Sequence, residues 1–355
     1  MQPPPLSFEP TLDRTVTEKR LAHLLVPGPL ASHDLDRRIL RLDRSFHRYA
    51  ACLPHGLWAP GLVISNEMRA LAELLLPLRE ILPLFDRLLA RGMSCPPFPG
   101  ASAIHHAHSW LDALQELERL ATGANPAELL TTLLADEEKR RIFFFLNFLP
   151  KRYGGSFNRY PGQRDFLGNW LMQHKQRYKG KLRCLDAACG SGEGTYDLAA
   201  LLVQCGFPPE DFLIHGATVE PFELFAAAHA FFPHDHERQR SYQRQVAPLF
   251  ADNTCARINF RLEDIAHTPI LDEPYLIVLC NGFLGGPFLH EQRGLAAAVT
   301  GLAGRLETGG ILLAADRFHG GWKKKVPETL LAEVFRKAGL EVLETGEGLA
   351  GVKTG

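Results

Sequence analysis

The chain has 355 residues, of which 46% are hydrophobic and 22% charged, the proportions of an ordinary water-soluble globular protein. Its length predicts two domains, and its formal net charge of -1 excludes a global field that would attract nucleic acid or an anionic membrane. The sequence has no signal-peptide pattern at its start and no apolar run long enough to span a bilayer, so we expect no membrane association. Its seven cysteines are scattered without a C-x-x-C pair, which predicts reduced thiols and a cytoplasmic location.

The first 150 residues are predicted to form an all-helical N-terminal domain. After a proline-rich start, helical spacing of apolar residues recurs in four stretches, which are 32–51, 65–91, 101–121 and 127–149. The last stretch carries the run 143–148 (FFFLNF), which predicts either a helix buried between two domains or a surface for a protein partner or lipid. His105, His106 and His108 have no acidic ligand beside them on one helix face, so we predict no metal site.

Residues 151–355 alternate between strand-like and helix-like patterns and are predicted to form an α/β domain. A boundary is expected at the KRYGG segment, 151–155. Helices are expected between apolar strands, which are 182–186, 212–218, 258–262, 275–280, 311–315 and one beginning at 340. This alternation predicts a mainly parallel sheet covered on both faces, with ligands bound at the carboxyl ends of its strands.

The stretch 182–200, LRCLDAACGSGEGTYDLAA, organises this second domain. An apolar strand ends in Asp186, glycines follow at 190, 192 and 194, and a helical pattern continues from Tyr196. Glycine lets backbone approach a ligand closely because it has no Cβ, and a helix start offers N–H groups to a polar ligand. A dinucleotide fingerprint needs its third glycine where Thr195 stands, and a carboxylate before the turn repels phosphates. A cationic ligand therefore fits better, although a dinucleotide and a turn without a ligand stay open as alternatives.

S-adenosylmethionine meets these requirements, because it carries a sulfonium and an ammonium but no phosphate. The glycine turn resembles motif I of the class I S-adenosylmethionine-dependent methyltransferases, which implies a Rossmann-like domain that binds this cofactor. The turn residues that we expect to contact the cofactor are Asp186, Ala188, Cys189, Gly190, Gly192 and Glu193. We expect Gly192→Val to abolish binding in a folded protein, because its Cβ would enter the space of the ligand.

Polar residues after the neighbouring strands predict further cofactor contacts. Glu220, just before Pro221, is placed either to accept from the ribose hydroxyls or to cap the following helix. Asp264 is placed to accept from the adenine amino group beside the backbone N–H of Ile265, or else to form a turn.

Two other segments complete the predicted site. Cys280 and Asn281 follow the fourth strand, where the asparagine backbone or amide could hold the methionine part, although Asn-Gly is also a turn signal. Arg159 lies outside the sheet pattern, and its guanidinium suits the free carboxylate of the methionine tail.

These segments also resemble the chemotaxis-receptor glutamate methyltransferases of the CheR family. The residues 187–199 are similar to that family's A-G-C-(A/S)-(S/T)-G-E-E-x-Y-S-L-A, and 157–161 (FNRYP) is similar to its F-F-R-D-P, whose arginine holds the cofactor carboxylate. Weaker likeness extends to 258–265 and 279–281. The resemblance implies that Arg159 binds the carboxylate and Glu193 the amino group of the methionine tail.

The departures from this family concern the substrate. The family has an acid where Thr218 stands, and its receptor-docking β-subdomain is replaced here by a short charged segment, 234–253. The resemblance therefore does not imply receptor glutamate as the substrate of this chain. The methyl acceptor is expected to be a protein or small-molecule group, and a protein carboxylate is one possibility. A further protein partner could bind through the helical N-terminal domain.

The expected reaction is in-line methyl transfer, for which positioning and desolvation could suffice. A carboxylate acceptor needs no general base, whereas an amine or a hydroxyl does. The candidates for such a base are His290, Tyr160, His319 and Asp316. The competing interpretation is a non-catalytic regulatory module that binds S-adenosylmethionine or S-adenosylhomocysteine.

Overall fold

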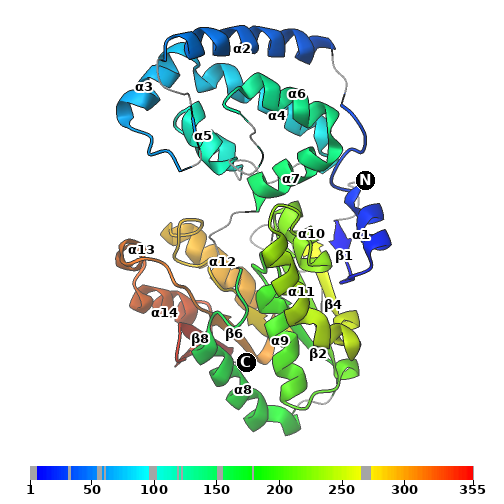
Figure 1. Ribbon diagram of the computed structural model, residues 1–355. Coiled ribbons are helices and arrows are strands. Elements are labelled where there is room, and N and C mark those ends of the chain that lie inside the picture. The colour runs from blue at the N-terminus through cyan, green and yellow to red at the C-terminus, as the bar shows by residue number, and fades with distance from the viewer. Residues whose placement is uncertain are drawn as a thin grey trace. The chain divides into compact units, whose positions relative to one another are not determined.

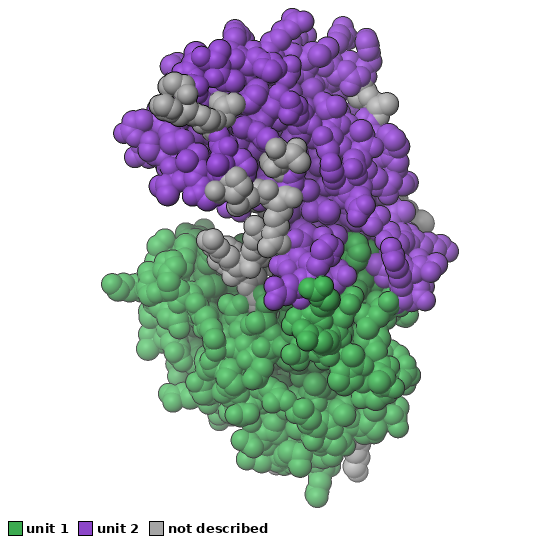
Figure 2. Space-filling view, in the orientation of Figure 1, with its two compact units in different colours: residues 1–12, 152–231, 240–355 green, residues 13–151, 232–239 purple. Residues whose placement is uncertain are grey.

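The computed structural model describes residues 6–30, 33–53, 58–59, 61–95, 102–117, 120, 123–149, 155–177, 180–264 and 273–354. The chain forms two compact units, which Figure 2 distinguishes by colour. Unit 1 contains residues 1–12, 152–231 and 240–355, and unit 2 contains residues 13–151 and 232–239. No helix in the described part of the chain combines the length and hydropathy of a membrane-spanning segment.

The named elements of unit 2 are helices (Figure 1). They are α1 (Arg14–Leu21), α2 (His33–Ala51), α3 (Asn66–Leu75), α4 (Leu78–Gly92), the 3₁₀ turn η1 (Ala103–His106), α5 (Trp110–Glu116), α6 (Pro126–Ala135) and α7 (Glu137–Phe148). The pattern 65–91 divides at Pro77, which precedes α4, whereas Pro83 stays inside that helix. The side chains of Phe143 and Phe144 are fully buried, and Phe143 packs against Phe85 of α4. This run is therefore core rather than an exposed surface for a partner or lipid.

Unit 1 is an α/β unit. Its strands are β1 (Ser7–Phe8), β2 (Leu182–Asp186), β3 (Phe212–Thr218), β4 (Ile258–Leu262), β5 (Tyr275–Leu279), β6 (Leu306–Ala314), β7 (Leu340–Glu344) and β8 (Leu349–Lys353). Its helices are α8 (Pro161–His174), α9 (Glu193–Gln204), α10 (Pro221–His229), α11 (His236–Ala251, which begins in unit 2), α12 (Gln292–Gly304), α13 (Gly320–Lys325) and α14 (Glu328–Lys337), with short 3₁₀ turns η2 (Lys175–Arg177), η3 (Pro209–Asp211) and η4 (Thr254–Arg257).

The eight strands form one sheet in the order β1-β4-β3-β2-β5-β6-β8-β7. The strands from β4 to β6 pair in parallel, β8 runs antiparallel to both β6 and β7, and β1 pairs antiparallel with β4. This confirms the predicted mixed α/β fold with a mainly parallel sheet. From β2 the chain builds outward through β3 and β4, then returns to β5 on the other side. The switch in strand order therefore lies between the carboxyl ends of β2 and β5, where such sheets bind ligands.

Helices cover both faces of this sheet. Neighbouring residues of a strand point to opposite faces. Leu185 of β2 belongs to an apolar cluster with Leu295 of α12 and Phe335 of α14, whereas the next residue, Asp186, bonds to Thr195 of α9. The carboxylate at the end of β2 is thus placed under the start of α9.

Two sequence expectations need correction. The first 150 residues are not all helical, because β1 lies within them, and a two-residue strand is too short to show alternation. The charged segment 234–253 contains no strand, as its pattern predicts, and most of it is the helix α11. The strand expected at 311–315 begins at Leu306, and the strand expected from 340 is followed by β8.

Candidate functional site

The glycine turn after β2 is fixed to the strands on both sides of it. The N–H of Ala187 donates to the carbonyl of Leu279 in β5 (2.7 Å), and the N–H of Cys189 donates to the carbonyl of Ala217 in β3 (2.9 Å). The turn therefore sits across the switch in strand order, as the sequence pattern predicts.

Two glycines of this turn have different surroundings. Gly190 and Gly192 adopt φ values of +52° and +92°, which favour glycine. A Cβ built on Gly190 meets no atom within 4 Å, so this position faces open space where a ligand has room. A Cβ built on Gly192 would lie 2.7 Å from the Cβ of Ala227 in α10. The reason given for the Gly192→Val expectation is therefore wrong, because the side chain would enter the protein core rather than the ligand's space, and its effect on binding stays a prediction.

Asp186 is a buried carboxylate at the end of β2, with 4% of its surface exposed. It accepts hydrogen bonds from Thr195 Oγ1 (2.8 Å) and from the backbone N–H of Ala188. Burial nevertheless raises the pKa of Asp186 to about 6, and the charges of Glu193 and Asp197 add to this rise. Because an ionised carboxylate is costly to bury without a counter-charge, a bound cation would stabilise the ionised form.

Further carboxylates surround the same turn. Burial raises the pKa of the Cys189 thiol well above its usual range, and the charges of Asp186, Glu223 and Glu193 raise it further. Glu223, from the first turn of α10, accepts a hydrogen bond from Thr218 Oγ1 (2.7 Å). An acid thus reaches the position next to Thr218, where the sequence showed none. Sequence reasoning missed Glu223, since it lies five residues further along the chain than Thr218.

A tyrosine of α11 holds the outer side of the turn. Tyr242 Oη donates to the carbonyl of Ser191 (2.6 Å), and Ser191 Oγ donates to Glu193 Oε2 (2.8 Å). The ring of Tyr242 also packs edge-on against Phe157, with centroids 5.0 Å apart. Sequence reasoning missed Tyr242, because nothing in the charged segment around it marks a contact with the glycine turn.

The segment that begins with Phe157 brings Arg159 toward the start of α9. The N–H of Asn158, a residue with φ +50°, donates to Asp197 Oδ2 of α9 (2.5 Å). The guanidinium carbon of Arg159 lies 5.5 Å from the centroid of the Tyr160 ring. Its Nε is buried and has no hydrogen-bond partner within the described part of the chain. Arg159 is thus a half-buried cation with unused hydrogen-bonding capacity.

Glu220 and Pro221 begin α10. Pro221 occupies the first turn of the helix, and Glu220 Oε1 accepts from the N–H of Phe222 (3.3 Å). Glu220 therefore caps α10, which is one of the two roles predicted for it. Glu220 is also buried at the carboxyl end of β3. A role in binding the ribose stays a prediction.

The residues after β5 form hydrogen bonds to neighbouring elements of the fold. Cys280 is buried, and its N–H donates to the carbonyl of Leu313 in β6 (2.9 Å). Asn281 Oδ1 accepts from the N–H of Ala315 (2.8 Å), and its Nδ2 donates to Gln163 Oε1 of α8 (2.8 Å). The Asn281 amide therefore joins β5, β6 and α8, so a cofactor contact at this residue would come from its backbone.

The structure describes one of the two residues that are predicted to contact the adenine. Asp264 lies half-buried, two residues after β4. Ile265 lies outside the described residues. The pairing of Asp264 with an adenine amino group stays a prediction.

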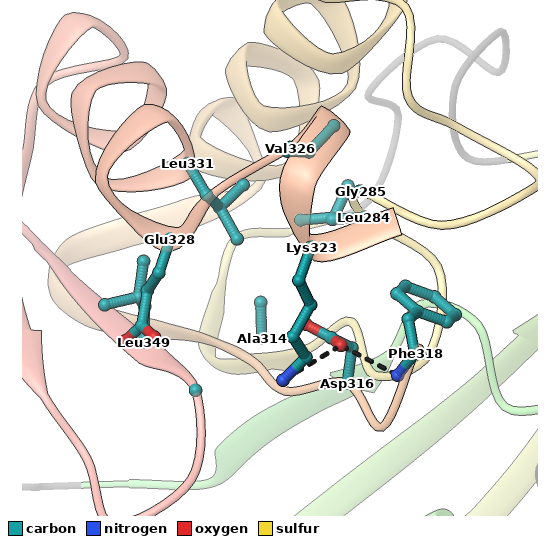
Figure 3. A pocket seen from close by; sticks show the side chains of 11 residues that line it. Leu284, Gly285, Ala314, Asp316, Phe318, Lys323, Val326, Glu328, Leu331 and Leu349 are labelled. Carbon is teal, nitrogen blue, oxygen red and sulfur yellow. Dashed lines mark hydrogen bonds and ion pairs between the residues drawn. The ribbon is translucent and has the colours of Figure 1, made fainter. Parts of the chain in front are cut away.

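Three of the four candidate bases are held in local interactions. His319 Nδ1 accepts from the N–H of Gly321 (3.2 Å), and His290 Nδ1 lies 3.2 Å from the carbonyl oxygen of Gly286. Asp316 Oδ1 accepts from the N–H of Phe318 (2.9 Å) and lies 3.6 Å from Lys323 Nζ. Figure 3 shows Asp316 on the wall of a cavity of about 70 Å³ between β6, α13 and α14. This volume is far below that of a pocket for a nucleoside-sized ligand.

No protein-family model matches the chain, and no curated protein sequence is similar to it. Among solved structures, the sugar N-methyltransferase KedS8 from Streptoalloteichus sp ATCC 53650 is 16% identical over 58% of this chain and 97% of its own, with a TM-score of 0.37. The N-methyltransferase NodS from Bradyrhizobium japonicum WM9, in complex with S-adenosyl-L-homocysteine, is 14% identical over 61% of this chain and 97% of its own, with a TM-score of 0.35. The cyclase SpnF is 22% identical over 51% of this chain and 58% of its own, with a TM-score of 0.34. Because the sequence identities and TM-scores are this low, the function of the site has to be inferred from its own residues.

Proposed function

We propose that this chain is an S-adenosylmethionine-dependent methyltransferase whose cofactor lies at the carboxyl ends of β2, β3 and β5. The observation that carries the proposal is the open position at Gly190 beside the carboxylates of Asp186, Glu193 and Glu223. These charges repel a pyrophosphate and attract a sulfonium and an ammonium. The strand order also argues against a dinucleotide, because antiparallel β8 separates β6 from β7, whereas the dinucleotide-binding sheet has the order 3-2-1-4-5-6.

The residues present fit the parts of this cofactor. Arg159 supplies a cation with a buried, unused Nε for the methionine carboxylate. Asp186 and Glu193 supply negative charge beside the turn for the ammonium, Glu220 suits the ribose hydroxyls and Asp264 the adenine amino group. The bound cofactor supplies a methyl group on a sulfonium that leaves as a neutral thioether. The chain itself has to fix the reacting groups in line and exclude water.

We further propose that the methyl acceptor is a carboxylate, as in the CheR-like interpretation. His319, His290 and Asp316 are engaged in local interactions. Burial raises the pKa of Tyr160, so its phenol is protonated at neutral pH and is a poor general base. Tyr160, His319 and Asp316 are therefore not arranged to deprotonate an amine or a hydroxyl, whereas His290 keeps a lone pair on Nε2, because its Nδ1–H donates to the carbonyl of Gly286. A carboxylate is already ionised at neutral pH and can attack the methyl group without a base.

The test is transfer of a tritiated methyl group from S-adenosylmethionine to cell lysate, followed by separation of protein from small molecules. Asp186→Asn is the matched negative control, because it removes the charge beside the glycine turn. Label that is lost as volatile methanol in mild base indicates a methyl ester and supports a carboxylate acceptor. Label that is stable in base overturns the proposal of a carboxylate acceptor but still supports a methyltransferase activity. Tight cofactor binding without any label favours the non-catalytic module.

A further inference from the structure

Tyr160 is a buried phenol at the carboxyl end of β5. It precedes Pro161 at the start of α8, and 9% of its surface is exposed. A Cβ built on Gly282, just beyond β5, would lie 4.0 Å from Tyr160 Oη. This oxygen is buried and makes no hydrogen bond of normal geometry within the described part of the chain, although the Arg159 guanidinium is near enough to oppose the rise in the pKa of the phenol. Leaving a buried hydroxyl unsatisfied costs stability, so its retention points to a ligand.

Two guanidinium groups lie beside the same ring. The guanidinium carbons of Arg159 and Arg317 are 5.5 Å and 5.8 Å from the ring centroid of Tyr160, within the range of cation–π contact. Arg317 also forms an ion pair with Glu347 (3.1 Å). Among the described residues no carboxylate forms an ion pair with Arg159, whose Nε is likewise unsatisfied. Asp316 also acts on this ring and raises the pKa of Tyr160, but it lies 3.6 Å from Lys323 Nζ, so Arg159 is the cation that suits an anion here.

The turn between β7 and β8 holds this arrangement in place. Glu347 Oε2 accepts from the N–H of Gly162 in the first turn of α8 (2.9 Å), while Glu347 Oε1 binds Arg317. A Cβ on Gly162 would lie 3.0 Å from the backbone carbon of Gly346, so the two backbones meet closely only because both residues are glycine. The start of α8 after Tyr160 and the side chain of Arg317 are therefore held in place before any ligand arrives.

We propose that Tyr160 Oη and the Arg159 guanidinium together bind one carboxylate, that of the methionine tail of the cofactor. This inference rests on the proposed function and adds Tyr160 to the cofactor site as a hydrogen-bond donor rather than a general base. A protonated phenol and a guanidinium are both donors, and a carboxylate can accept from both at once. The carboxylate of a methyl acceptor has the same chemistry, so the test has to distinguish the two sources.

The experiment compares Tyr160→Phe with the wild type by calorimetry, using S-adenosylhomocysteine and its decarboxylated analogue, which keeps the ammonium. We expect Tyr160→Phe to lower the affinity for S-adenosylhomocysteine about tenfold, the usual effect of one hydrogen bond to a charged group. The affinity for the decarboxylated analogue should not change. The melting temperature should stay the same or rise slightly, because the lost hydroxyl makes no hydrogen bond of normal geometry within the described part of the chain.

The matched control is Tyr275→Phe, which removes another buried tyrosine hydroxyl. Tyr275 Oη lies 2.8 Å from His215 Nδ1, at the other end of β5. We expect this variant to melt at a lower temperature but to bind both ligands as the wild type does. An unchanged affinity of Tyr160→Phe for S-adenosylhomocysteine, or an equal loss for both ligands, overturns the inference while the proposed function stands. A wild type that binds neither ligand overturns the proposed function itself.

Discussion

Replacement of Asp186 by asparagine should stabilise the free protein while it removes cofactor binding. The carboxyl is 4% exposed, and its pKa rises from 3.8 to about 6 on folding. At about 1.4 kcal/mol per pKa unit, the folded state gives up about 3 kcal/mol at neutral pH to keep this group ionised. Asparagine has nearly the same shape and no charge, and its amide oxygen has to accept from both partners of the carboxylate, Thr195 Oγ1 and the N–H of Ala188, because the amide nitrogen only donates.

The sign of the pH dependence follows from the raised pKa. A buried acid with a raised pKa favours folding while it is protonated, and that contribution is lost as the pH rises from about 4 through about 6. We therefore expect Asp186→Asn and the wild type to have similar free energies of unfolding near pH 4. At pH 7 the variant should be more stable by about 3 kcal/mol. Asp197, whose burial also raises its pKa to about 6, is present in both proteins, but its charge contributes to the raised pKa of Asp186, so the two carboxylates titrate as a coupled pair.

The assay is urea unfolding of both proteins at four pH values between 4 and 8, combined with calorimetry of S-adenosylhomocysteine binding at pH 7. We expect a gain in stability that grows with pH, together with a loss of affinity of at least tenfold. A variant that is less stable than the wild type at pH 7 would show that the buried charge of Asp186 does not lower stability. One that binds S-adenosylhomocysteine normally would show that this charge is not needed for cofactor binding.

Three further predictions concern the same turn. Gly192→Ala should lower the free energy of unfolding, measured in urea, by about 1 to 3 kcal/mol, because its Cβ would lie 2.7 Å from that of Ala227. Gly190→Asn should lower this free energy by about 1 kcal/mol or less, yet weaken S-adenosylhomocysteine binding at least tenfold. Equal effects of the two substitutions on stability would contradict this contrast. Tyr242→Phe removes the 2.6 Å hydrogen bond to the turn, so we expect a loss of about 1 kcal/mol in urea and severalfold weaker binding by calorimetry; wild-type affinity would refute that role. The affinity for S-adenosylmethionine should fall as the pH is lowered through about 6, by up to about tenfold per pH unit, because protonation of Asp186 removes its charge; a flat titration between pH 5 and 7 would exclude this coupling.

The parts of the fold that could be predicted from sequence are those with strong local patterns. The apolar strand that ends in Asp186, the glycines after it and the helical spacing of α9 all fall within residues 182–204, so local chemistry determines them. Likewise, an apolar run such as Tyr275–Leu279 is recognisable because both faces of a central parallel strand are buried.

The parts that could not be predicted depend on contacts between distant segments. The strand β1 has two residues and exists because it pairs with β4, some 250 positions later. Tyr242 and Glu223 reach the glycine turn through tertiary packing of α11 and α10, which no local pattern encodes. The orientation of Gly192 is a further case, since the sequence shows that a glycine is required but not whether a ligand or the core occupies its free side.

In the candidate site, too, some features could be predicted from the sequence and others depend on tertiary contacts. The prediction that polar residues gather at the carboxyl ends of the strands followed from topology alone. Individual roles depend on which hydrogen bonds are already used, and sequence cannot show this. The Asn281 amide is committed to Gln163 and Ala315, whereas the Tyr160 hydroxyl makes no hydrogen bond of normal geometry in the described part of the chain.

The most direct test of the central claim is a calorimetric titration of the wild-type protein at pH 7.5 with S-adenosylmethionine and, separately, with NAD. The account predicts saturable binding of S-adenosylmethionine at one site per chain and no measurable binding of NAD, because the buried carboxylates around Cys189 favour a cation and repel a pyrophosphate. Binding of NAD, or the absence of any heat with S-adenosylmethionine, would contradict it.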